Sequence, residues 1–451
     1  MNFSSRVVRI IRSVVTIDKR GAALVGLAAG WFFCILCGYY VIRPIREAMG
    51  VKSGNESLHW LFLGTFVAML LAVPIYSACI AKLRRSLLIA VVYRFFITNL
   101  LLFWWLFQSE SPEVRVWVAR AFFVWASVFG VYATTVFWSV LTDIFDSRDA
   151  KLSFGLIAAG GTLGAIAGSI AASLLAKQFA THTLLLVPAV LLEIGLWLAA
   201  GLQRCSQHSV VDNTALASPI ANASKSTLAA GEPTGGGVVD GIVSVVKSAY
   251  LRWICLFLFL GQLCATQLYF QQTSIVRDAI PDDAGRTQLF ANMNLGVQVL
   301  TLVLQLSVAG LMTYRIGLGI ALAATPIAYL ISFATLGVAP TLAVFVIADV
   351  VRRGLAYGVA VPAREVLFTV VSREDKYKSK GFIDTVIVRG GDAISSQLLA
   401  VARQIFSSPM VIQLGMIPVA ALWVAISIRL ASWQRKLAKP NTAKLRRKLF
   451  P

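Results

Sequence analysis

Long apolar stretches recur along the chain at short intervals, and they constrain its fold more than any other feature. Each is about 20 residues long, the length that an α-helix needs to cross the ~30 Å hydrocarbon core of a bilayer. Twelve stretches are found, at residues 22–42, 58–80, 86–107, 116–141, 153–176, 183–202, 250–274, 289–313, 316–337, 342–371, 381–404 and 411–431. Because helices satisfy all their backbone hydrogen bonds internally, the sequence predicts an all-α integral membrane protein with twelve transmembrane helices.

The composition and the placement of charge support a membrane location. Hydrophobic residues make up 58% of the 451 residues and charged residues 14%, against about 45–50% and about 25% in soluble domains. A net charge of +20 could indicate nucleic-acid binding, but Lys and Arg gather in the loops of one side. The positive-inside rule places those loops and both termini in the cytoplasm. We therefore expect a multi-pass protein of a bacterial plasma (inner) membrane, with the lipid bilayer and no nucleic acid as partner.

Residues 203–248 differ in composition from the rest, because Ser, Ala, Thr, Gly and Asn dominate there. This composition is typical of a flexible linker, which the loop count places in the cytoplasm. The linker divides the chain into an N-terminal six-helix bundle at 1–202, with a basic cytoplasmic arm, and a C-terminal six-helix bundle at 249–432. A basic cytoplasmic tail follows at 433–451.

The two halves show signs of an internal repeat of six helices each. Arg46-Glu47-Ala48 follows the first apolar stretch, and Arg277-Asp278-Ala279 follows the seventh, 231 residues later. Gly30 and Gly261 align at the same offset. Transporters are often built from such repeats, with the solute site at the interface between them, so the repeat predicts a solute pathway between the halves.

Ionisable residues inside the apolar stretches are candidates for function, because each costs ~2.5–3.5 kcal/mol at the membrane centre on insertion scales. The tenth stretch contains Asp349, Arg352, Arg353, Tyr357, Arg364 and Glu365, and the eleventh contains Asp384, Arg389 and Asp392. We expect them to face the interior of the bundle. Helical spacing places Asp349 one turn from Arg353, as its counter-ion.

This cluster has two interpretations. It is either a paired network that latches the tenth and eleventh helices together as a gate, or a set of guanidinium groups that binds an anionic solute. Arginine matches carboxylate and phosphate groups in a bidentate geometry, and Tyr357 could stack on or hydrogen-bond to the solute. The sequence leaves both interpretations open.

The N-terminal half also carries charge. Arg43, Arg46 and Glu47 close the first helix, and Arg120 lies within the fourth. Arg120 has no acidic residue at helical spacing, so an acid on another helix or the anion of a ligand must satisfy it.

Two further patterns concern helix packing. Gly160, Gly164 and Gly168 have the small-xxx-small spacing that allows two helices to pack closely. A polar stripe on the seventh helix either lines a cavity or forms hydrogen bonds between helices; it consists of Gln262, Thr266, Tyr269 and Thr273.

Motifs of enzymes and ATP-driven pumps do not occur: the sequence has no GxxxxGK[ST], no HExxH and no GxSxG. Cys34 and Cys37 have CxxC spacing, but the chain has only three histidines as further ligands, so we expect packing rather than metal or redox chemistry. We predict no catalytic residue, no metal and no cofactor.

Several of these segments resemble the ATP:ADP antiporter (nucleotide translocase) family of the major facilitator superfamily, in particular its divergent bacterial branch. The similar segments are GYYVIRPIRE at 38–47, PARE at 362–365 with LFT at 367–369, and REDKYK at 373–378 leading through Lys380, Ile383, Asp384, Arg389, Gly390, Gly391 and Asp392. The resemblance implies a twelve-helix major facilitator fold, alternating access, and exchange of nucleotides or another phosphorylated anion.

Together these features predict a secondary active transporter for a small anionic solute such as a nucleotide or other phosphorylated metabolite. The predicted solute contacts are Arg43, Arg46, Arg120, Arg353, Tyr357, Arg364 and Arg389, and the predicted gate or coupling residues are Glu47, Asp349, Glu365, Lys380, Asp384 and Asp392. The alternative is a scaffold or sensor that keeps the fold without transport. That alternative predicts intramembrane charges that neutralise one another and leave no accessible polar pocket.

Overall fold

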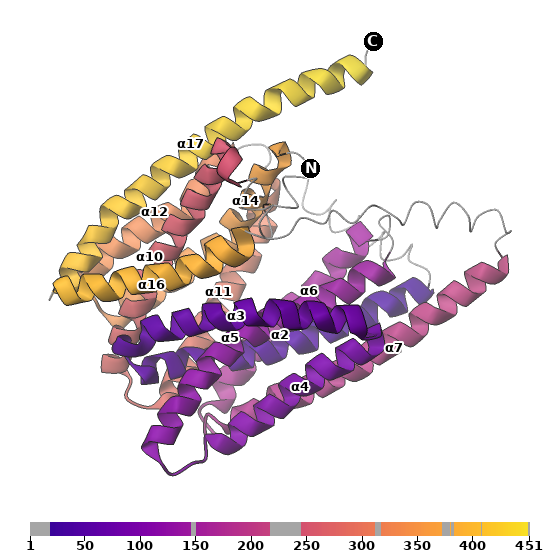
Figure 1. Ribbon diagram of the computed structural model, residues 1–451, viewed down its shortest axis with the longest axis horizontal. Helices are drawn as coiled ribbons and strands as arrows, with labels where there is room; N and C mark the ends of the chain where they lie inside the picture. The colour runs from indigo at the N-terminus through magenta and orange to yellow at the C-terminus, as the bar shows by residue number, and fades with distance from the viewer. Residues whose placement is uncertain are drawn as a thin grey trace. The chain divides into compact units, whose positions relative to one another are not determined.

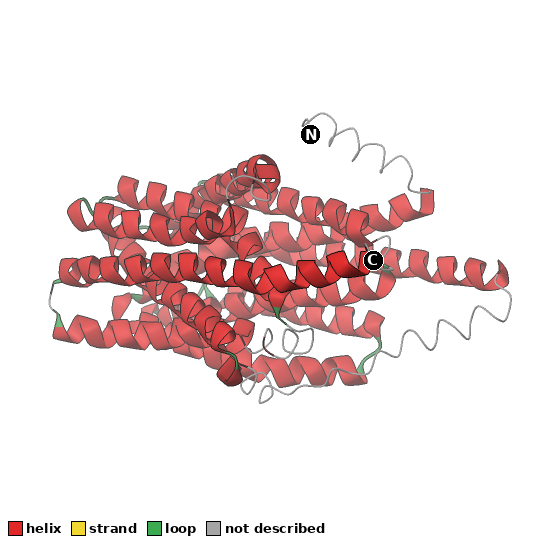
Figure 2. Ribbon diagram, turned by 90° about the horizontal axis from the view of Figure 1, so that it is seen from above, coloured by secondary structure: helices red, strands yellow, loops and turns green. Residues whose placement is uncertain are grey.

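The computed structural model describes residues 19–145, 150–216, 245–311, 317–371, 379, 383–406 and 408–449. Within these ranges the regular elements are all helices (Figure 2). Ten of the described helices are long and apolar enough to cross a membrane, by length and composition. The prediction of an all-α membrane protein is therefore confirmed.

The described residues of the predicted stretches lie in helices, apart from single residues at the ends of some stretches; residues 312–313, 316 and 381–382 lie outside the described residues. Two of them, 342–371 and 381–404, are not among the ten long apolar helices. The first is divided into short helices, and the helix of the second contains Arg389, Asp392 and Arg403. The segments that deviate from simple membrane-spanning helices are thus the ones that carry the predicted charge cluster.

The chain folds into two compact units. Unit 1 consists of Met1–Lys52, Ala68–Ala230 and Asp282–Leu295. Its helices are α2 (Lys19–Ser53), α4 (Arg85–Leu106), α5 (Pro112–Ile144), α6 (Ala150–Leu175), η1 (Thr183–Leu185) and α7 (Leu186–Leu216), with the later part of α3 (Asn55–Lys82) and the first part of α11 (Asp283–Leu311). Helix α7 continues to Leu216, into the predicted linker, because no Gly or Pro lies between Gly201 and Pro219. Residues 217–244 of that linker lie outside the described residues.

Unit 2 consists of Ser53–Val67, Gly231–Pro281 and Gly296–Pro451. Its helices are α10 (Ala249–Ala279), α12 (Gly317–Val338), α13 (Leu342–Leu355), η3 (Ala356–Ala360), α14 (Val361–Leu367), η4 (Phe368–Val370), η5 (Ile383–Ile387), α16 (Val388–Ile405) and α17 (Pro409–Leu449), with the remaining parts of α3 and α11. Within this unit α12 packs along α17, and α10 packs along α16 (Figure 1).

The core of unit 1 is built around α2. Trp31, Ile35 and Ile42 on this helix are fully buried. The ring of Trp31 lies edge-on to Phe137 of α5 with 4.9 Å between ring centroids. Edge-on aromatic pairs at this distance stabilise a core beyond their burial alone, so α2 is held to α5 by ring packing.

The contact of α2 with α6 depends on glycine. A Cβ atom added to Gly160 would lie 2.8 Å from the carbonyl oxygen of Ala29, and a Cβ added to Gly164 or Gly168 would collide with the carbonyl oxygen of Phe33 or Cys37. The three glycines therefore let the α6 backbone touch the α2 backbone along about two turns. The predicted role of this spacing in close helix packing is confirmed.

The tenth predicted helix is irregular because of a proline. Regular α-helix ends at Leu355 and is followed by the π-helical turn η3 and then by α14, which carries Pro362 in its first turn. Proline has no N–H to donate and its ring crowds the preceding turn, so the regular hydrogen-bond pattern cannot continue across it. The widened turn places Gly358 against Leu304 of α11.

Candidate functional site

Asp349 forms the centre of an ion network in unit 2. Its carboxylate is 1% exposed, its Oδ1 accepts from Nη2 of Arg352, and its Oδ2 lies 3.1 Å from Nη1 of Arg353. Arg352 also donates to the hydroxyl of Tyr329 on α12, at 2.6 Å. The predicted contact between Asp349 and Arg353 is present, and the network ties α13 to α12.

Arg352 and Tyr329 were not among the predicted site residues. Arg352 follows Asp349 by three residues and Arg353 follows it by four, so the two guanidinium groups both lie within reach of the same carboxylate. The ring of Tyr329 lies 5.0 Å from the Arg352 guanidinium carbon, which adds a cation–π contact. The sequence shows Arg352 among the charged residues of this stretch, and its helical spacing from Asp349 indicates the pair, whereas nothing in the sequence near Tyr329 indicates its contact.

Farther along the tenth segment, Arg364 lies beside Glu365, with 3.6 Å between Nη2 and Oε1. The side chains are 24% and 42% exposed, so this is a partly exposed pair rather than a buried latch. Tyr357 is 39% exposed. In the eleventh segment Arg389 and Asp392 are half-buried. The side chain of Asp384 and the whole of Lys380 lie outside the described residues.

In unit 1 the predicted residues at the end of α2 form a second network. Arg46 donates from Nη1 to Glu47 at 2.8 Å and from Nε to the hydroxyl of Ser127 on α5 at 2.9 Å. Its guanidinium carbon also lies 4.0 Å from the ring centroid of Phe123. Arg43 is near the hydroxyl of Tyr40, at 3.4 Å. The charge of Arg46 is therefore held between a carboxylate, a hydroxyl and an aromatic face.

Arg120 differs from Arg46, Arg353 and Arg364, each of which lies within ion-pair distance of a carboxylate. It is half-buried within α5, and its guanidinium lies 4.8 Å from the ring of Trp117. Its Nε atom is buried, and no hydrogen-bond acceptor in the described part of the chain reaches it. The sequence offered two partners for this side chain, an acid on another helix or a ligand anion; the described contacts include no acid.

The polar stripe predicted on α10 lies mainly in helix contacts. Gln262 donates from Nε2 to the carbonyl oxygen of Val388 at 2.9 Å, Thr266 and Thr273 are buried, and the ring of Tyr269 lies edge-on to Phe62 at 5.3 Å. Of the two interpretations given to this stripe, the structure favours contacts between helices.

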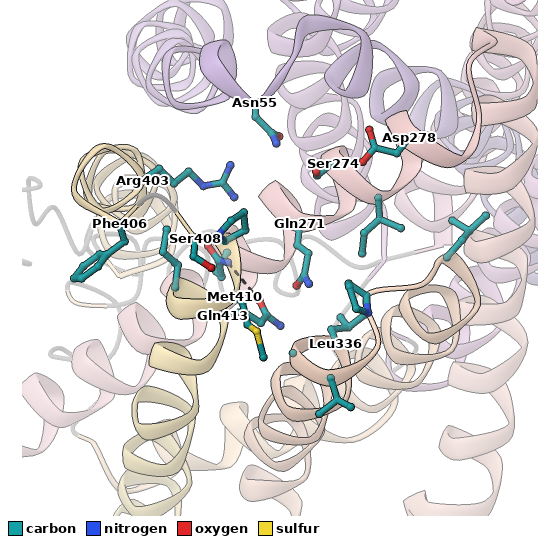
Figure 3. A pocket seen from close by; sticks show the side chains of 18 of the residues that line it. Asn55, Gln271, Ser274, Asp278, Leu336, Arg403, Phe406, Ser408, Met410 and Gln413 are labelled. Atoms are coloured by element: carbon teal, nitrogen blue, oxygen red, sulfur yellow. Dashed lines mark hydrogen bonds between the residues drawn. The ribbon is translucent and has the colours of Figure 1, made fainter.

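An adjacent face of α10 lines a cavity of about 910 Å³ in unit 2 (Figure 3). The cavity lies where α10, α12 and α16 end and where α13 and α17 begin. The residues of α10 on this face are Gln267, Gln271, Ser274, Ile275 and Asp278. Its volume is in the range of ligand sites, about 300–1,000 Å³.

Amide groups form the floor of this cavity. Gln267 and Gln413 are 3% and 2% exposed, and Nε2 of Gln267 donates to Oε1 of Gln413 at 3.4 Å. Gln413 in turn donates to the carbonyl oxygen of Phe333, at 3.4 Å. The Oε1 atoms of Gln267 and Gln271 are buried and have no hydrogen-bond partner in the described part of the chain. Buried polar groups are normally satisfied, so this wall has hydrogen-bonding capacity left for a ligand or for water.

Opposite charges face one another across the cavity. Arg403 of α16 and Asp278 of α10 point toward it from opposite sides, and Asn55 lies between them at the rim (Figure 3). The guanidinium of Arg403 rests 4.4 Å from the ring centroid of the buried Phe270. Neither Arg403 nor Asp278 forms an ion pair with another described residue.

Sequence reasoning missed this cavity. Gln267, Gln271, Ser274 and Asp278 follow one another at spacings of four, three and four, which is the signature of one helical face. The signal was present beside the stripe that was predicted, but periodicity alone does not tell which face meets a cavity.

Comparisons with known proteins identify the fold. No family model and no characterised sequence matches the chain. A bacterial homologue of the iron transporter ferroportin, in an inward-facing state, covers 91% of this chain and 98% of its own at 11% identity, with a TM-score of 0.64. A transporter of the POT family, bound to a thioalcohol-conjugated peptide, covers 92% and 96% at 11% identity, with a TM-score of 0.59. The nucleoside transporter NupG covers 94% and 100% at 15% identity, with a TM-score of 0.57.

These neighbours are major facilitator transporters, and the protein has their fold. The similarity spans nearly the full length of both chains in each pair, so it covers both units and not one alone. The closer resemblance to the ATP:ADP antiporter family remains a prediction from the sequence.

Proposed function

We propose that this protein is a secondary active transporter that moves a small anionic solute, such as a nucleotide or another phosphorylated metabolite, by alternating access. The fold supports the first part of the proposal, because the structural neighbours described above are transporters of solutes as different as peptides, nucleosides and iron. Fold alone does not define a substrate, so the charge of the solute is argued from side chains.

The environment of Arg120 is the observation that best supports an anionic solute. An arginine within a membrane-spanning helix costs ~2.5–3.5 kcal/mol on insertion scales and is normally compensated by a partner. The described contacts of Arg120 include the aromatic face of Trp117 and no carboxylate. A phosphate or carboxylate of a solute would supply the missing charge with a bidentate hydrogen bond.

The networks around Asp349 and Arg46 fit the gate role better than the contact role. In both, a carboxylate and a hydroxyl already occupy guanidinium nitrogens. Such networks hold one arrangement of helices until a competing charge displaces a partner, which is how an ion-pair gate couples to solute binding. In this proposal Arg353 and Arg46 belong to gates, while Arg120 and Arg389 contact the solute.

The scaffold alternative is less well supported. It expects intramembrane charges that neutralise one another and no accessible polar pocket. Unit 2 instead contains a polar-lined cavity of about 910 Å³, and Arg120 in unit 1 lacks a carboxylate partner among the described residues. A protein that only needed the shape of the fold would have no reason to retain these costly features.

Transport in proteoliposomes tests the proposal. Labelled ATP, inorganic phosphate and an organic dicarboxylate are offered to purified protein, and uptake is compared with protein-free liposomes. Arg120→Gln and Arg389→Gln should each lower uptake about tenfold or more, since each removes a charged hydrogen bond to the solute. Arg115→Gln, on an exposed side chain of the same helix as Arg120, is the matched control and should transport normally. Unchanged uptake in both test variants would reject the assignment.

A further inference from the structure

The cavity of unit 2 has a charge pattern different from that of the proposed anion contacts. Its charged lining residues are Arg403 and Asp278, one cation and one anion. The remaining polar lining consists of the neutral side chains of Asn55, Gln267, Gln271, Ser274, Ser408 and Gln413. The site as a whole is therefore neutral, and the two charges lie on opposite walls (Figure 3).

A neutral cavity with two separated charges does not suit the anionic solutes that are proposed to bind Arg120. A nucleotide carries several negative charges, and it would meet one guanidinium group here together with the repulsion of Asp278. A molecule without charge would pair with neither Arg403 nor Asp278. The charges are matched only by a ligand that carries both a negative and a positive group.

We propose that this cavity binds a zwitterionic amino-carboxylate, with its carboxylate on Arg403 and its ammonium group on Asp278. Arg403 is suited to the first contact because its guanidinium is half-buried against Phe270, which fixes the side chain and strengthens its charge interactions. Asp278 is exposed at the end of α10 and accepts hydrogen bonds from an ammonium group. The Oε1 atoms of Gln267 and Gln271, which have no partner among the described residues, then accept hydrogen bonds from the polar groups of the ligand between its two ends.

The depth of the polar face supports a ligand that enters from one end. Along α10, Gln267 is buried, Gln271 is half-buried, and Ser274 and Asp278 are exposed, so the face runs from floor to mouth. In the predicted topology this mouth opens away from the cytoplasm.

This site uses none of the residues assigned to the anionic solute, and the inference goes beyond the proposed transport function.

Equilibrium binding to the full-length purified protein in detergent tests this inference, with dialanine as the probe. N-acetyl-dialanine lacks the ammonium group and dialanine amide lacks the free carboxylate. Calorimetry should show that both analogues bind about tenfold or more weakly than dialanine, because each loses one charge contact. Because the measurement requires no transport, its failure would not affect the transport proposal, and loss of uptake in Arg120→Gln would not affect the binding result.

Two variants assign the contacts. Arg403→Gln should weaken dialanine to the level of its amide and leave the amide unchanged, whereas Asp278→Asn should weaken dialanine to the level of the acetylated analogue. Arg429→Gln is the control for the first, because Arg429 also rests against an aromatic ring, that of Trp253 at 4.7 Å, outside the cavity. Glu56→Gln is the exposed control for the second.

Three results would overturn the assignment. The first is that dialanine does not bind the natural protein at millimolar concentration. The second is that dialanine and N-acetyl-dialanine bind equally well. The third is that dialanine binding is unchanged in both Arg403→Gln and Asp278→Asn. Thermal unfolding of each variant, measured alongside, shows whether a loss of binding reflects the contact or a loss of folded protein.

Discussion

The two units differ in the regularity of corresponding helices. In unit 1 the fourth and fifth helices, α5 and α6, are uninterrupted. In unit 2 the corresponding segments contain the π-helical turns η3 and η5. The interrupted segments are also those that carry Asp349, Arg353, Arg364, Arg389 and Asp392. Irregular turns of this kind frequently occur at functional sites, and in unit 2 they coincide with the segments that carry the charged residues.

Despite this difference, the units share details that support their origin as a repeat. A Cβ added to Gly30 of α2 would lie 3.3 Å from Leu198 of α7, and a Cβ added to Gly261 of α10 would lie 2.8 Å from Trp423 of α17. In both units this glycine allows the first helix to approach the last. The aligned glycines of the sequence therefore have equivalent packing roles.

The largest effect is expected at the buried charge of unit 2. Asp349→Ala leaves Arg352 and Arg353 without the carboxylate that both contact, and breaking a buried ion pair on one side costs about 3–5 kcal/mol. Unfolding in mixed micelles should show this loss of stability. The matched change in unit 1, Glu47→Ala, removes one contact of Arg46, which keeps Ser127 and Phe123, and should cost less. Equal losses would contradict the difference drawn between the units.

A smaller loss is expected from the close helix contact of unit 1. In Gly164→Ala the added methyl group collides with the carbonyl oxygen of Phe33, so α6 must move away from α2. Overpacking of this kind costs about 1–3 kcal/mol, visible as a lower midpoint of thermal unfolding. Gly155→Ala, on the same helix with open space around it, is the control and should be neutral or slightly stabilising. A neutral Gly164→Ala would show that the contact is looser than described.

The smallest effect tests whether the two units begin corresponding helices in the same way. Ser111 and Thr341 cap α5 and α13, and their hydroxyl oxygens accept from Val114 and Val344 at 3.5 and 3.4 Å. Replacement of either by Ala should cost about 1 kcal/mol, the usual value of such a cap. Denaturant midpoints of the two variants should shift alike if the helix starts are equivalent, and a shift in only one would argue against equivalence.

Much of the fold could be predicted from the sequence, because membrane insertion imposes length and apolarity on each helix. The glycine spacing of α6 was equally informative, since only close approach of another backbone explains three glycines on one face. The turn η3 was harder to predict. Pro362 indicates that the helix is interrupted, but it does not indicate that a π-helical turn precedes it.

The site was harder to predict, for a physical reason. Contacts within one helix follow from spacing, so the pair of Asp349 and Arg353 could be predicted. Contacts between helices depend on how each helix is rotated, which the sequence does not give directly. The contact of Arg352 with Tyr329 and the cavity between Arg403 and Asp278 both belong to this second kind.

The glycine seam between α2 and α6 has a mechanical consequence. Where a helix backbone rests on the carbonyl groups of its neighbour at Ala29, Phe33 and Cys37, neither helix can slide by part of a turn without a steric clash. The two helices must therefore move together as one rigid body during any conformational change. Any bending within unit 1 must then occur at helix contacts that are filled by flexible side chains.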